Sequence, residues 1–103
     1  MEEKRYWRFK TSTEKVKGGH VVVSIDSFEL CTLLDIDARS TTAIICNQFN
    51  VLEKISPIYL MEYEKEFSGE SPHFLFIFAE QFAEIYEQDV VISNELLSEV
   101  NEK

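Results

Sequence analysis

Glycine and proline are scarce in this chain, which has three glycines and two prolines among 103 residues. Loops that cradle phosphate groups depend on several closely spaced glycines, so we expect no phosphate-binding loop of that kind. No serine is flanked by the pair of glycines that forms a nucleophile elbow either. Two common routes to catalysis are therefore missing from the sequence.

Cysteine and histidine are equally rare. Cys31 and Cys46 are too few for a disulfide framework, and we expect two buried thiols that pack as small apolar groups. His20 and His73 lie far apart in the chain, and no two of these four residues have the short spacing of zinc ligands. We predict no metal and no cofactor.

One short motif resembles a known catalytic sequence pattern. Leu33-Leu34-Asp35-Ile36-Asp37 resembles the apolar run and D-x-D with which haloacid dehalogenase phosphatases hold Mg²⁺ and supply a nucleophile. Those enzymes also need a lysine and further carboxylates from a much larger α/β domain, and the residues before Asp35 look helical. We therefore interpret the segment as a polar loop at a helix terminus and predict that the chain is not an enzyme.

Long apolar runs are absent as well. No stretch reaches the roughly 20 apolar residues of a membrane-spanning helix, and the N-terminal MEEKRYWRFK lacks the apolar centre of a signal peptide. We expect a cytoplasmic protein with one compact domain over residues 1–103, since 45% hydrophobic content suits one modest core.

Positive charge is scarce in the C-terminal part of the chain. Residues 1–17 carry six basic and three acidic residues (+3), residues 18–61 two and five (−3), and residues 62–103 two and eleven (−9), which sums to the net charge of −9. Such a field repels nucleic acid and attracts basic surfaces. The competing explanation is an acidic surface that only maintains solubility.

The N-terminal third predicts a β-hairpin. Alternation in Arg5 to Thr11 predicts a strand with Trp7 and Phe9 on one face, and His20 to Ile25 is rich in β-branched residues. Between them, residues 12–19 are polar and end in two glycines, which indicates a connection of eight residues or a flexible loop.

Three segments after the hairpin predict helices. Asp26-Ser27 can cap a short helix over Phe28 to Leu34, and Ser40-Thr41-Thr42 can open a longer one through about Ile55. A third, over Ile58 to Phe67, follows Ser56-Pro57 and matches in part the later Ser71-Pro72 segment, although a strand remains open there.

The segment from Ser71 to Gln88 holds five aromatic residues and predicts the central helix, with Leu75, Phe78, Phe82 and Ile85 in the core. A buried strand over His73 to Phe78 remains the alternative. Asp89 to Ile92 predicts a short strand, and Ser93 caps a last helix. The expected fold is α+β: a small antiparallel sheet led by the hairpin, with about four helices packed on one face.

These features predict a small acidic inhibitor that blocks a larger, basic protein. Immunity proteins that neutralise nuclease toxins act this way, because their carboxylates bind the cationic side chains that would otherwise hold the substrate phosphates. Two alternatives stay open: a phage-type anti-defence protein that mimics nucleic acid (anti-CRISPR or anti-restriction), and a structural or adaptor subunit of an oligomer, including a homo-oligomer. We expect neither nucleic acid nor a membrane as a direct partner. The predicted partner-binding residues are Glu62, Tyr63, Glu64, Glu66, Glu70, Glu80, Glu84, Tyr86, Glu87 and Asp89.

Overall fold

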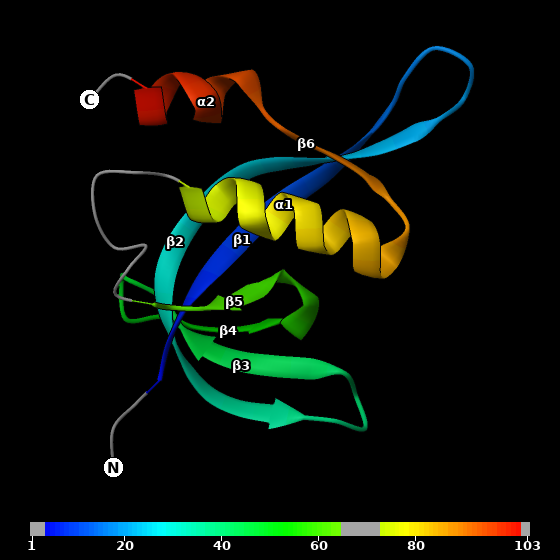
Figure 1. The fold of residues 1–103 in the computed structure, drawn as a ribbon. Coiled ribbons are helices and arrows are strands. Elements are labelled where there is room, and N and C mark those ends of the chain that lie inside the picture. Colours follow the sequence, from blue (N-terminus) through cyan, green and yellow to red (C-terminus); the bar gives the residue numbers. More distant parts are fainter. Residues whose placement is uncertain (1–3, 65–72, 102–103) are drawn as a thin grey trace. The chain divides into compact units, whose positions relative to one another are not determined.

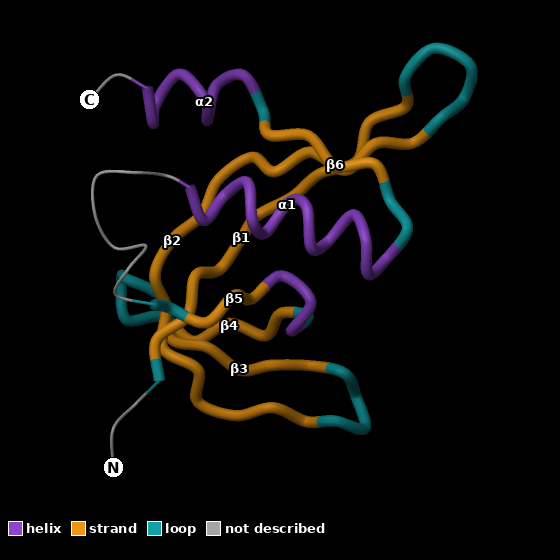
Figure 2. Tube along the Cα trace, viewed as in Figure 1, coloured by secondary structure: helices purple, strands orange, loops and turns teal. Residues whose placement is uncertain are grey.

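The computed structural model describes residues 4–64 and 73–101, which fold mainly into strands (Figures 1 and 2). Its elements, in chain order, are β1 (Arg5–Lys15), β2 (Val21–Asp37), β3 (Thr42–Cys46), β4 (Leu52–Ile55), the 3-10 turn η1 (Pro57–Tyr59), β5 (Leu60–Glu62), α1 (His73–Tyr86), β6 (Asp89–Ile92) and α2 (Asn94–Asn101).

The six described strands belong to one sheet, in the order β4-β3-β2-β1-β5, with β6 paired to β2 outside this path. The chain divides into two compact units, and the long strands β1 and β2 pass through both. The described part of the first unit is residues 4–9 and 28–64, and that of the second is residues 10–27 and 73–101. The expectation of a single compact domain stays a prediction.

The predicted hairpin is present, with a shorter connection than expected. β1 continues to Lys15, so the first half of the segment expected to be a loop is strand. The turn is closed by hydrogen bonds from the Val16 N–H to the His20 carbonyl (2.8 Å) and from the Gly19 N–H to the Val16 carbonyl (3.1 Å). Gly18 and Gly19 have φ of 94° and 80°, a backbone region that only glycine adopts without strain.

The helix expected over residues 28–34 is wrong, because this segment is the second half of β2. Glu29 and Cys31 are buried while Leu30 and Thr32 are half-buried, which is the two-residue period of a strand. The Asp26 carboxylate, expected to cap the helix, accepts a hydrogen bond from the Ser24 hydroxyl instead (3.1 Å). Strands on both sides of β2 supply hydrogen bonds that no local capping motif can match.

The helix expected over residues 40–55 is also wrong, and the segment forms the antiparallel hairpin β3–β4. Ala43 and Ile45 are fully buried and alternate with half-buried neighbours. Phe49 and Leu52, which the helical spacing would have placed inside, are 74% and 64% exposed. Asn50 adopts a positive φ of 66° in the turn, which asparagine tolerates better than most residues.

The third expected helix, over residues 58–67, is wrong for its described part. Pro57 starts the single turn η1, and Leu60–Glu62 then pairs with β1, so the strand alternative is correct for this stretch. The interpretation of Ser56-Pro57 and Ser71-Pro72 as starts of two similar helices therefore fails at its first copy. Residues 65–72 lie outside the described part of the chain.

The predicted C-terminal helices and strand are present, but Ile85, which we expected in the core, is 68% exposed, and the predicted helix start at Ser71-Pro72 lies outside the described residues. α1 buries Phe74, Leu75, Phe78 and Phe82, and it packs against β6, which pairs in parallel with β2. The last helix, α2, is capped as expected, because the Ser93 hydroxyl accepts a hydrogen bond from the Leu96 N–H (3.2 Å).

The expected fold class must accordingly be corrected. An N-terminal hairpin in a sheet is present, but the described residues contain six strands and two short helices in place of about four helices on one face. The sheet is antiparallel except for the pair of β2 and β6.

Candidate protein-binding surfaces

The outward face of α1 carries closely spaced carboxylates. Glu80 and Glu84 lie one helical turn apart and are exposed, and Glu87 directly follows the helix and is exposed as well. At 3.6 residues per turn, these three positions fall within roughly a quarter of a turn around the helix axis. We call Glu80, Glu84 and Glu87 the acidic stripe.

The end of α1 explains why Glu87 projects at this point. Glu87 has a φ of 51°, the left-handed conformation that commonly ends a helix, and the Gln88 N–H donates to the Ala83 carbonyl (3.2 Å). This arrangement closes the last turn and places the third carboxylate of the stripe beside the helix terminus.

Apolar side chains are also exposed on α1, and one of them shares the face of the stripe. Phe76 precedes Glu80 by one turn on the same face and is 49% exposed, and Ile85 is 68% exposed. Tyr86, predicted as an interface anchor, is 39% exposed, and its ring centroid lies 4.6 Å from that of Phe82. Exposed apolar groups among charges of one sign are typical of protein-binding surfaces.

Lysine and arginine are missing from the described chain segment that carries the stripe. The described segment 73–101 has six acidic residues, all exposed, and neither lysine nor arginine. Among the described residues, the only ion pair of this segment joins Asp89 to His20, both more than half exposed. The six acidic residues are Glu80, Glu84, Glu87, Asp89, Glu95 and Glu99.

The remaining predicted residues belong to other parts of the chain. Glu62 and Glu64 are exposed at the end of β5 and just after it, in the first unit. Tyr63 is half-buried there: the guanidinium of Arg5 lies 4.6 Å from its ring centroid, and the Trp7 ring lies 5.8 Å away. Glu66 and Glu70 lie outside the described residues.

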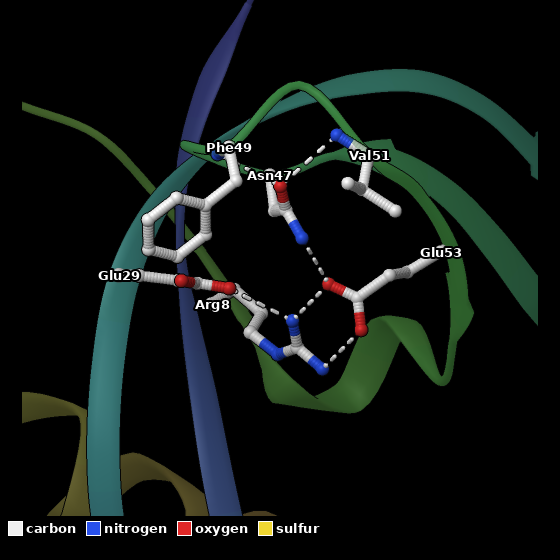
Figure 3. Close-up of polar contacts among 6 residues, drawn as sticks. All are labelled: Arg8, Glu29, Asn47, Phe49, Val51 and Glu53. Atoms are coloured by element: carbon white, nitrogen blue, oxygen red, sulfur yellow. Dashed lines mark hydrogen bonds and ion pairs between the residues drawn. The ribbon is translucent and has the colours of Figure 1, made fainter.

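The prediction did not anticipate a charged network inside the first unit (Figure 3). The guanidinium of Arg8 lies between two carboxylates, donating to Glu29 Oε1 at 2.9 Å and to Glu53 at 2.7 and 3.2 Å. The side chains of Arg8 and Glu29 are only 11% and 9% exposed, and that of Glu53 is 31% exposed. These hydrogen bonds raise the pKa of Arg8, against the opposing effect of its burial.

The contacts of this network also show that the sheet of the first unit is curved. Arg8 belongs to β1 and Glu53 to β4, and β2 and β3 lie between these strands in the sheet order. In a flat sheet, three strand spacings of about 4.8 Å would separate the two backbones. Their direct contact therefore requires this part of the sheet to curl, with Arg8, Glu29 and Glu53 on the inner face.

The network extends into the β3–β4 turn. The Asn47 amide donates to Glu53 (2.9 Å), and its oxygen accepts the backbone N–H groups of Phe49 (2.9 Å) and Val51 (3.1 Å). A side chain that satisfies two turn N–H groups limits the conformations of the turn. The turn thus holds Phe49 in a defined position although the ring is exposed.

Both cysteines are free thiols, as expected, but only one is fully buried. Cys31 lies on the inner face, where burial raises its pKa to about 11. Cys46 is half-buried, and its thiol donates to Asn50 Oδ1 (3.3 Å).

The D-x-D segment ends a strand, which corrects the expectation of a helix terminus. Asp35 and Asp37 are exposed, and Asp37 accepts backbone hydrogen bonds from Arg39 (3.0 Å) and Ser40 (3.4 Å). Hydrogen bonding by the Ser40 side chain and by these N–H groups lowers the pKa of Asp37. Within residues 4–64 and 73–101, no three histidine, cysteine or acidic side chains gather closely enough to hold a metal ion.

Comparisons of the chain with protein families, with curated proteins and with solved structures find no match. None of the helices in the described part of the chain has the length and apolar character that crossing a membrane requires.

Proposed function

We propose that this chain is a protein-binding inhibitor that covers a basic surface of a larger protein, as an immunity protein covers a nuclease toxin. The observation that carries the proposal is that segment 73–101 has six acidic residues, all exposed, and no lysine or arginine. The acidic stripe on α1 is the proposed centre of contact.

Electrostatics favours a cationic partner at this face. The three carboxylates of the stripe repel one another, and a basic surface would relieve that repulsion while gaining attraction. Long-range attraction of this kind accelerates association by roughly 10- to 1,000-fold at low ionic strength.

Apolar contacts would supply the short-range part of the binding. Phe76 lies on the same face as Glu80 and is 49% exposed, so burying its ring would add apolar area at the centre of the contact. The expected partner therefore has lysine or arginine side chains around an apolar patch that receives Phe76.

The test begins with a pull-down: the chain is immobilised and used to capture a partner from a lysate of cells that naturally produce the chain. The partner is then purified, and its association rate is measured with the wild type, with E80K/E84K and with the control E14K/D26K, which changes the net charge equally at exposed sites outside segment 73–101. We expect a basic partner whose association with E80K/E84K is at least about tenfold slower at low salt, with the difference largely gone at high salt.

Equal association rates of the two variants would remove the stripe from the contact. Inhibition of the captured protein's activity supports the inhibitor proposal. Competition by DNA or RNA for the same partner site would instead favour mimicry of nucleic acid as the mode of inhibition.

A further inference from the structure

The outward face of the β2–β3–β4 ladder in the first unit has a charge arrangement that complements itself. In an antiparallel ladder, directly paired residues point to the same side of the sheet. Ile44 pairs with Asp35 on β2 and with Lys54 on β4, so these three side chains form one row across the strands. We call this face, opposite the inner face that carries Glu53, the outer face.

A second row follows along β3, and on β2 the two rows are separated by an irregularity of the register between Leu33 and Asp35. Cys46 pairs with Thr32 on β2 and with Leu52 on β4, and Leu52 is 64% exposed. The inner-face residues that alternate with these, Ala43 and Ile45, are fully buried. The outer face therefore has an apolar centre along β3 and β4.

Charges of opposite sign flank this centre. Asp35 and Lys54 are both exposed, and they lie on the strands at either side of β3. Within the described residues, neither forms an ion pair. A uniformly basic surface would be repelled by Lys54, and a uniformly acidic surface would be repelled by Asp35. Only a partner that places a basic group against Asp35 and an acidic group against Lys54 attracts both.

A second copy of this chain has that arrangement. We propose that the outer face is a homodimer contact in which a two-fold axis runs along β3. Rotation about this axis places Asp35 of each copy opposite Lys54 of the other, and Ile44 and Cys46 each against their own counterpart. The contact is isologous, because the same residues serve both copies.

The size of the face sets the expected strength. Stable dimers bury about 800 Å² on each partner, and two rows of three residues are a smaller surface. The chain also carries a net charge of −9, so two copies repel one another at long range. We expect a weak, reversible dimer that forms at high protein concentration once roughly 0.15 M salt has screened that repulsion.

The test is sedimentation equilibrium of the full chain under reducing conditions, with the variants D35K, K54D and the double exchange D35K/K54D. Each single variant places like charges opposite each other twice and should weaken dimerisation by at least about tenfold. The double variant keeps the net charge of −9 and recreates both pairs with reversed sign, so it should restore dimerisation to within about threefold.

The controls K15D and E14K make the same charge changes at exposed positions of the second unit and should leave dimerisation close to that of the wild type. Cys46 supplies an independent readout: a short bismaleimide should link two copies of the wild type and none of C46S. A monomer at all concentrations up to about 0.5 mM would overturn the proposal. So would a dimer that both single variants retain, or one that the double exchange fails to restore.

Discussion

Replacing Arg8 by methionine tests the charged network inside the first unit. Methionine retains much of the aliphatic length of arginine, so the substitution removes mainly the guanidinium and its three hydrogen bonds to Glu29 and Glu53. The Glu29 carboxylate, 9% exposed, would then stay buried without its cation.

The size of the effect follows from this burial. Removing one partner of a buried ion pair costs about 3–5 kcal/mol, because an uncompensated charge remains. Water can reach the Glu53 carboxylate, which is 31% exposed, and this reduces the cost. We expect R8M to lower the free energy of unfolding by about 2–4 kcal/mol and the melting temperature by roughly 10–20 °C.

Urea unfolding followed by tryptophan fluorescence measures this change, since Trp7 is the sole tryptophan of the chain. The matched control is K10M, which removes an exposed positive charge from the same strand and should change the unfolding free energy by less than about 0.5 kcal/mol.

The triple variant R8M/E29Q/E53Q separates the loss of charge balance from the loss of packing. It should recover most of the stability lost in R8M, because no unpaired charge remains. A loss below about 1 kcal/mol in R8M, or a triple variant no more stable than R8M, would refute the reasoning.

Three further predictions concern backbone strain and thiol chemistry. Thr41 is β-branched and adopts a φ of 52°, so T41G should raise the unfolding free energy by about 1 kcal/mol in urea titrations, whereas T42G, in β3, should lower it. An unchanged or lower stability of T41G would contradict this. In C46S at pH 8, iodoacetamide should modify Cys31 about 100-fold more slowly than it modifies a free thiol, because a pKa raised from 9.0 to about 11 reduces the thiolate fraction. The raised pKa also means that the stability from the buried neutral thiol is complete below pH 9 and is lost as the pH rises towards about 11, which denaturation of C31A and wild type across this range would show. Rapid modification of Cys31 in the folded protein would be inconsistent with its burial.

The expectations that held depended on local signals. Gly18-Gly19 required a turn, the β-branched run after His20 formed a strand, and Ser93 capped the last helix. α1 followed from apolar residues at helical spacing, and the same spacing placed Glu80 and Glu84 on its outward face. The acidic stripe was therefore visible before the fold was known.

The same type of signal failed between residues 28 and 62. Apolar residues near positions 44, 49 and 52 matched a helical stripe, but Ile44 lies in a strand and Phe49 in a turn. Asn47 and Asn50 were a turn signal that the helical spacing concealed. Pairing between strands decided this region, both in the hairpins β2–β3 and β3–β4 and with the distant strand β1, and periodicity within one segment contains no information about that pairing.

Sequence by itself determined where charge accumulates, which segments must turn, and which helix carries the central aromatic residues, because these depend on neighbours in the chain. Tertiary structure alone decided the charged network and the outer face. Arg8, Glu29 and Glu53 are up to 45 positions apart, and only the curled sheet brings them into contact. The row of Asp35, Ile44 and Lys54 likewise exists only through the register of three strands. A shift of one residue in that register would turn Ile44 to the other face and remove the row.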